Sequence, residues 1–279
     1  MLKSLLIGLD GSDDSRSVLE LGLRWAKRFD ALAVGLAIID ELGILTSGAV
    51  QFSGGHHWHA ASPAPLLLSN SRRRVELTLE QFARRCVEAG VTGRSLEDVG
   101  SPFVRILIEA QRHDLILLDQ RTHFDYRSGG EPDKTLAKVL QDSPRPVVAV
   151  PKTLPDGEAV VVAYDGSLQA ARALYAFEAS GLGVSREVHV VSVASDYEEA
   201  TRRADVAVGF LRLHGIEATP HPVDMSVPTA EVILRKVRYL EAGLLVMGAY
   251  GQPALREFFL GSTTRTVLEE SPVPVFCYH

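Results

Sequence analysis

The residues whose types could do chemistry gather near the C-terminus, and their spacing suits a backbone cradle for an anion. Gly248 and Gly251 follow an apolar run at 244–247, and Gly261 and Ser262 come after nine intervening residues. Glycine permits positive φ and lets backbone N–H groups approach an anion closely. Periodic apolar residues predict a helix from Ser262 onward, whose N-terminus adds unpaired amides and a favourable dipole. The spacing therefore predicts a loop that binds phosphate.

Hydroxyl and carboxylate groups extend this candidate site. Ser262 and Thr264 can donate hydrogen bonds from the first turn of the predicted helix, and Asp165 follows another apolar run at 160–164. Simpler explanations stay open for both segments. Asp165 begins the sequence Asp-Gly-Ser, which also suits a turn with a helix cap, and residues 248–251 also suit a flexible connection.

An internal repeat places these residues on defined elements. The segment 5–12 returns as 160–167, 155 positions later, and 143–150 returns as 271–278, 128 positions later. Each copy begins with an apolar strand pattern, Asp-Gly-Ser and a helical pattern, and ends in an apolar strand preceded by prolines. Because the offset falls along the chain, the first half carries an insertion at about residues 40–75.

The repeat also defines the fold class. Strand patterns without alternating polarity, separated by helical patterns, predict parallel sheets with helices on both faces. We expect an α/β protein of two tandem Rossmann-like domains, residues 1–152 and 156–279, each with five parallel strands. Ligands of such sheets bind beyond the carboxyl ends of the strands. The apolar last strands, 147–150 and 273–278, are expected to pair with each other, because an unpaired edge invites aggregation.

The whole constellation resembles a known motif. Gly-x-x-Gly, nine residues and Gly-Ser before a final strand, with Asp165 and the repeated plan, resemble the ATP-binding motif of the universal stress protein family. The resemblance covers essentially the whole chain. It implies adenine nucleotide alpha hydrolase-like domains, ATP as the ligand with or without Mg, and a nucleotide-responsive regulatory role in stress response.

The same resemblance implies roles for single residues. Asp165 would contact the ribose, and Ala163 and Val193 would line the adenine through their backbone. Met247 would pack beside the adenine. The residues implied around the phosphates are Gly248, Tyr250, Gly251, Gly261, Ser262, Thr263 and Thr264.

The first half lacks the phosphate loop. At the offset of 128, the positions of Gly248, Gly251, Gly261 and Ser262 hold Gln120, His123, Asp133 and Lys134. Side chains then stand where backbone would have to approach phosphate, and the Asp133 carboxylate would repel it. We therefore expect one nucleotide per chain, in the second half. A smaller anion near Arg121, Arg127 and Lys134 stays open.

Composition argues against several other classes. The chain has 279 residues and a net charge of -6 without a basic cluster, so we expect no nucleic-acid partner. The first apolar run is too short for a signal peptide or a membrane span, which predicts a cytoplasmic protein. Cys86 and Cys277 stand alone in apolar segments and are expected to be reduced and buried. Residues 56–59, His-His-Trp-His, lack a nearby Cys or carboxylate, so no metal is assigned.

Three functions compete. The resemblance implies a binding protein, expected as a homodimer, whose nucleotide occupancy changes its assembly or its contact with a protein partner. No residue is assigned a catalytic role, because no P-loop and no general base accompany the glycines. A slow ATP-hydrolysing enzyme and a scaffold that binds no nucleotide are the alternatives.

Overall fold

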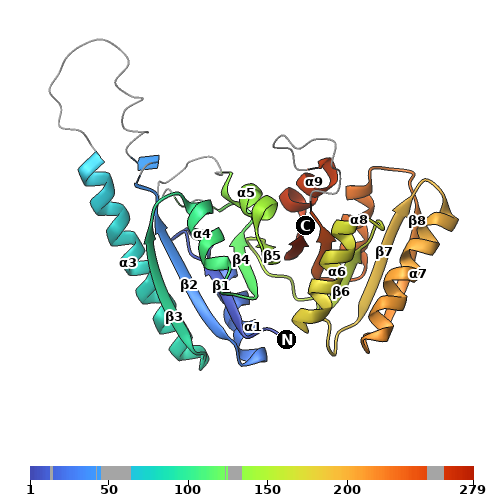
Figure 1. Ribbon diagram of the computed structural model, residues 1–279, viewed down its shortest axis with the longest axis horizontal. Coiled ribbons are helices and arrows are strands. Elements are labelled where there is room, and N and C mark those ends of the chain that lie inside the picture. The colour runs from blue at the N-terminus through green and yellow to red at the C-terminus, as the bar shows by residue number, and fades with distance from the viewer. Residues whose placement is uncertain (13–14, 42, 45–63, 123, 125–133, 250–260) are drawn as a thin grey trace, which may run out of the picture.

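The computed structural model describes residues 1–279 except 13–14, 42, 45–63, 123, 125–133 and 250–260. Within these residues, strands form one sheet in the order β3-β2-β1-β4-β5-β10-β9-β6-β7-β8 (Figure 1). The elements of the first half are β1 (Ser4–Gly8), α1 (Ser15–Phe29), β2 (Leu32–Ile39), α3 (Ala64–Ala89), β3 (Gly93–Val99), α4 (Pro102–Ala110), β4 (Leu115–Asp119), α5 (Thr135–Asp142) and β5 (Val147–Val150).

The second half repeats this order of strands and helices. Its elements are β6 (Ala159–Ala163), α6 (Leu168–Ser180), β7 (Val188–Ala194), α7 (Tyr197–Leu213), β8 (Ala218–Asp224), α8 (Thr229–Tyr239), β9 (Ala242–Gly248), α9 (Ser262–Glu270) and β10 (Val275–Tyr278). All strand pairs within a half are parallel. The predicted α/β class, with five parallel strands in each half, is confirmed.

Helices cover both faces of the sheet, as the strand patterns predicted. Apolar residues of α1, α3, α6 and α7 share one buried cluster with one face of the strands. Those of α4, α5, α8 and α9 share a second cluster with the opposite face. Because central strands such as β4 and β5 are buried along their whole length, their sequences are continuous apolar runs.

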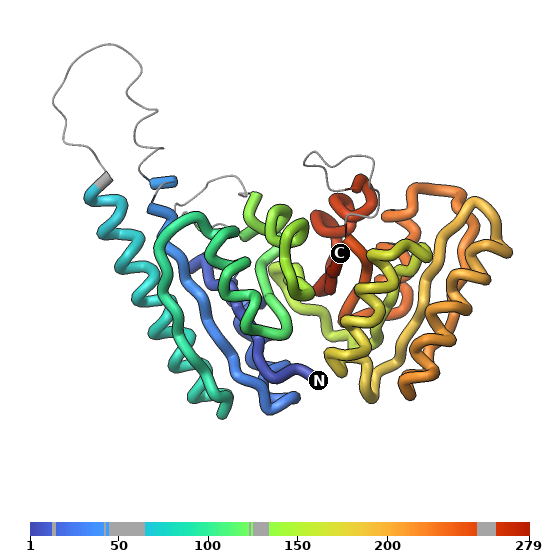
Figure 2. Tube along the Cα trace, viewed as in Figure 1, coloured from blue at the N-terminus to red at the C-terminus, as the bar shows by residue number. Residues whose placement is uncertain are grey.

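The two halves join through their last strands. β10 runs antiparallel to β5, with Val275 opposite Ala149 and Cys277 opposite Val147. The predicted pairing of the last strands is therefore confirmed. The halves also meet where the chain begins, since the backbone amide of Leu2 donates to the carbonyl of Ser180 at the end of α6, 3.3 Å away (Figure 2).

The outermost strands carry features that oppose further strand pairing. β3 reads GRSLEDV and is mostly exposed, and β8 reads ATPHPVD. The prolines of β8 have no N–H to donate to another strand, and charged side chains on an edge have the same protective effect.

The described end of the predicted insertion is helical. α3 begins at Ala64 and has 26 residues, whereas its counterpart α7 has 17. Val75 of α3 packs with Ile39 and Ile44 in a small third cluster, which Leu67 and Leu68 flank. Part of the insertion therefore lengthens a helix, while residues 56–59 lie outside the described residues.

Candidate functional site

The apolar part of the predicted site is built by three strands that end at the same edge of the sheet. Ala163, the last residue of β6, lies opposite Met247 of β9 and Val191 of β7. Ala163 and Val193 are half-buried, and both pack against the buried cluster that contains Met247. The structure thus places the three residues to which the resemblance gave the adenine on neighbouring strands at this edge, with Val193 two positions beyond the register partner of Ala163.

Asp165 lies in the turn that leads from β6 into α6. Gly166 adopts the left-handed conformation with φ 78°, and Asp165 Oδ1 accepts a hydrogen bond from the amide of Ser167 at 2.9 Å. Ser167 in turn caps α6, because its hydroxyl accepts from the amide of Ala170 at 3.1 Å. The turn-and-cap explanation therefore describes the local geometry correctly. The carboxylate is nevertheless exposed, and its Oδ2 has no hydrogen-bond partner among the described residues.

Gly248 has a structural reason to be glycine. A Cβ at this position would lie 2.6 Å from the backbone nitrogen of Ala170 and 2.7 Å from the carbonyl carbon of Gln169. The end of β9 therefore packs directly against the first turn of α6. The sequence pattern indicated a glycine that lets phosphate approach the backbone. The structure shows a glycine that lets the backbone of α6 approach the end of β9.

Among the described residues, no side chain caps the N-terminus of α9, which suits an anion site. Its N-cap is Gly261, which has no side chain to occupy the first amides, and its first turn has no acidic residue. The φ of Gly261 is −52°, an angle that residues with a side chain also adopt, so this glycine does not serve a positive φ. Among the described residues, which exclude 250–260, no heavy atom beyond its chain neighbours lies within 4 Å of a Cβ placed on Gly261. What this glycine leaves out is a side chain beside the first amides of the helix.

The hydroxyl residues of α9 differ in exposure. Ser262 is exposed, Thr263 is half-buried and Thr264 is buried in the first turn of the helix. Tyr250 and Gly251, the remaining predicted site residues, lie outside the described residues.

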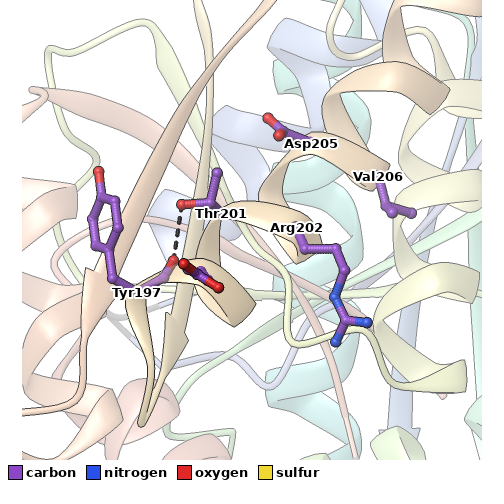
Figure 3. Close-up of a pocket in the computed structure, with 6 residues that line it drawn as sticks. Tyr197, Thr201, Arg202, Asp205 and Val206 are labelled. Atoms are coloured by element: carbon purple, nitrogen blue, oxygen red, sulfur yellow. Dashed lines mark hydrogen bonds between the residues drawn. The ribbon is translucent and has the colours of Figure 1, made fainter.

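The N-terminus of α7 offers a contrast at the same edge of the sheet. Asp196 caps it, accepting from the amides of Glu198 and Glu199 at 3.4 and 3.3 Å. A shallow, open depression along the outer face of α7 is lined by Tyr197, Glu198, Thr201, Arg202, Asp205 and Val206 (Figure 3). Carboxylates in and beside this depression would repel phosphate, so α7 does not fit an anion as α9 does.

The first half arranges the equivalent residues differently. Asp10, the counterpart of Asp165, is 3% exposed. Its Oδ1 accepts hydrogen bonds from the amide and hydroxyl of Ser12 at 2.9 and 2.6 Å and from the Ser15 hydroxyl. Lys134 is the N-cap of α5 and makes no capping hydrogen bond with its side chain. His123 and Asp133 lie outside the described residues.

Sequence reasoning missed Arg203, which lies beside the Asp165 turn. Its Cγ is 3.6 Å from a Cβ placed on Gly166, and its Nε donates to Glu199 at 2.6 Å. The equivalent position in the first half holds Thr78. No spacing rule connects an arginine in the middle of α7 to a turn before α6, so only the fold reveals this neighbour.

Other candidate groups are explained by the core. The cysteines are free and buried as predicted, and burial raises the pKa of Cys277 to about 12, so its thiol is a poor nucleophile. The described part of the chain brings together no group of three or more His, Cys, Asp or Glu side chains that could hold a metal. In the described ranges no helix combines the length and apolar character needed to cross a membrane.

Comparison with known proteins gives the family of this α/β chain, which contains two copies of one unit. The sequence model described as the Universal stress protein family matches residues 158–279. A Thermus aquaticus relative, the universal stress protein in the QAH/OAS sulfhydrylase 3'region, is 31% identical over 129 residues, or 42% of this chain and 94% of that protein. The chain belongs to the universal stress protein family.

Two further matches extend over both halves of the chain. Universal stress protein Slr1230 of a Synechocystis species is 28% identical over 220 residues, or 77% of this chain and 71% of that protein. The crystal structure of a universal stress protein from Archaeoglobus fulgidus has a TM-score of 0.73 at 24% identity and covers 99% of this chain and 97% of that chain. The second likeness shows a shared fold.

Some solved members of the family contain nucleotides. One from Archaeoglobus fulgidus is in complex with dAMP; it has 24% identity and a TM-score of 0.37, with 43% of this chain and 97% of that chain covered. Another universal stress protein is in complex with cAMP; it has 19% identity and a TM-score of 0.34, with 55% and 98% covered.

Proposed function

We propose that the second half binds one adenine nucleotide, ATP, and that its occupancy regulates contacts of this protein with a partner during stress. The observation that carries the proposal is the convergence of three kinds of surface at one edge of the sheet. The half-buried Ala163 lies beside Met247 at the ends of the neighbouring strands β6 and β9. The exposed Asp165 carboxylate follows β6, and the N-terminus of α9, which no described side chain caps, comes next after β9 along the chain. Each suits a different part of a nucleotide.

The proposed roles follow from the chemistry of each surface. The wall of Ala163, Val193 and Met247 would pack against a face of the aromatic base, and Asp165 would accept hydrogen bonds from ribose hydroxyls through Oδ2. The amides of the first turn of α9 would hold phosphate, helped by the helix dipole. Ser262, Thr263 and Thr264 would add hydroxyls, with Gly248, Tyr250, Gly251 and Gly261 completing the loop. Mg, where present, would accompany the phosphates.

The family supports an adenine nucleotide as the ligand class. Members in complex with dAMP and with cAMP show that such ligands occur among universal stress proteins. ATP is the finer proposal, and it rests on the length of the loop between β9 and α9 and on the resemblance of its glycine spacing.

We assign binding, without rapid turnover, to this site. Backbone amides, hydroxyls and a helix dipole stabilise bound phosphate in the ground state and supply no base to activate water. The competing function is slow hydrolysis of ATP. Its support is the exposed Asp165 carboxylate, whose Oδ2 could hold a metal ion.

Identifying the nucleotide that leaves the purified protein on denaturation tests this proposal. We expect an adenine nucleotide, at no more than one per chain, and a strong loss in Asp165→Ala. Asp224→Ala is the matched control, because Asp224 is another exposed carboxylate at the end of a strand, two strands away in β8. Absence of nucleotide after incubation with ATP, or two nucleotides per chain, would contradict the proposal.

A further inference from the structure

The antiparallel pairing of β5 with β10 places the carboxyl ends of the strands of each half beside a turn of the other half. Val275, at the start of β10, lies opposite Ala149 near the end of β5. The residues that follow β4 therefore meet the turn between α9 and β10. The reverse also holds, so the end of β10 meets the turn between α5 and β5 (Figure 1).

The first contact across the junction fixes the end of α9. Gln120 directly follows β4, and its side-chain Nε2 donates to the carbonyl of Ser271 at 3.2 Å. Ser271 is the C-cap of α9 and is buried. Its own hydroxyl donates to the carbonyl of Val273 at 2.8 Å, which closes the turn locally. The first half thus holds the turn at which α9 ends.

The second contact fixes the start of the loop that leads to α9. The Tyr278 hydroxyl donates to the carbonyl of Pro144, in the turn between α5 and β5, at 3.2 Å. The backbone carbonyl of the same Tyr278 accepts from the amide of Ala249 at 2.9 Å, and Tyr278 is the register partner of Gly248. One residue therefore connects the loop after β9 to the first half.

We propose that Gln120 and Tyr278 are positioning residues for the nucleotide site of the second half. Together they attach both ends of the segment 249–271, which contains α9, to the first half. Gln120 stands at the position equivalent to Gly248, so the residue that the first half carries in place of this glycine is also the donor to Ser271. In this proposal the first half, through the Gln120–Ser271 and Tyr278–Pro144 hydrogen bonds, holds the nucleotide-binding segment of the second half in place; we call this role the brace. This inference rests on the proposed nucleotide site.

Isosteric variants isolate the two hydrogen bonds. Gln120→Met and Tyr278→Phe keep most of the side-chain volume and remove the donor. A hydrogen bond of this kind contributes enough for roughly a three- to tenfold change in a local equilibrium. Arg28→Met is the matched control, because Arg28 also crosses between the halves, donating to the carbonyl of Val184 at 2.6 Å, and Val184 lies between α6 and β7 and not beside α9 in the chain.

The test combines amide hydrogen exchange of the nucleotide-free protein with calorimetric titration of ATP. We expect exchange within residues 262–270 to rise about three- to tenfold in Gln120→Met, and the dissociation constant for ATP to rise by a similar factor in both variants. Arg28→Met should change neither quantity, even where it lowers the melting temperature.

Two results would overturn the brace. One is unchanged exchange in α9 in Gln120→Met, and the other is ATP affinity in both variants equal to that of the wild type. If the wild-type protein binds no ATP, the proposed function fails, and the exchange measurement alone decides whether the first half holds α9.

Discussion

Replacing Gly248 by Ala tests how closely β9 packs against α6. The added Cβ would lie 2.6 Å from the Ala170 nitrogen, 2.7 Å from the Gln169 carbonyl carbon and 3.0 Å from the Ala170 Cα. These are backbone atoms, and the Ser167 cap holds the Ala170 amide at 3.1 Å. They cannot move aside as a flexible side chain would. The first turn of α6 must therefore shift, which costs about 1–3 kcal/mol of stability by analogy with other overpacked sites.

Denaturant unfolding measures this cost, and Gly209→Ala is the control. Gly209 lies inside α7, and a Cβ there would meet no heavy atom within 4 Å. Alanine should stabilise that helix by about 0.5–1 kcal/mol, because glycine loses more backbone entropy on folding. Opposite signs for the two substitutions are expected. Equal stability of Gly248→Ala and the wild type would refute the packing argument and leave ligand contact as the reason for this glycine.

The remaining predictions concern protonation, thiol chemistry and turnover. Burial first, and then the charges of Lys236 and His189, lower the pKa of His221 below its ordinary 6.5. The unfolded chain therefore binds the proton more tightly, so the free energy of unfolding should fall as the pH drops below 6.5, and His221→Leu should reduce this loss in urea titrations at several pH values. Cys277 should resist a thiol reagent in the native protein and react after unfolding, as mass spectrometry can show. Steady-state hydrolysis of ATP with Mg should stay well below about one per second; a rate near that value that disappears in Asp165→Ala would contradict a pure binding role.

The parallel sheets and the junction between them could be predicted because the pattern that encodes them is local and repeated. The apolar runs at 5–9 and 160–164 predict buried parallel strands. The similar apolar strands that end the two halves, at 147–150 and 275–278, predict the pairing that joins the halves. Each half must cover its own edge, so the last strands pair. The length of α3 escaped prediction because the helix gains its first turns inside an inserted segment that has no counterpart in the second half.

The sequence predicted which residues lie at the candidate site better than it predicted the structural role of each residue. Glycine spacing located Gly248 and Gly261, but the close contact of Gly248 is with a helix that begins 80 residues earlier in the chain, at Leu168. Gly261 leaves no side chain beside the first amides of α9 and has no special φ. The contribution of Gln120 depends on an antiparallel junction that brings it to Ser271, and no local pattern records such a contact.

Calorimetric titration of ATP into the wild type and Gly261→Val tests the central claim most directly. The φ of Gly261 is allowed for valine, so the substitution should cost α9 no more than about 1 kcal/mol, and the fold survives while a branched side chain stands beside the first amides of the helix. We predict one site per chain in the wild type and no measurable binding in Gly261→Val, with circular dichroism spectra that coincide. Two equivalent sites in the wild type, or undiminished binding in Gly261→Val, would contradict a nucleotide held on α9 of the second half.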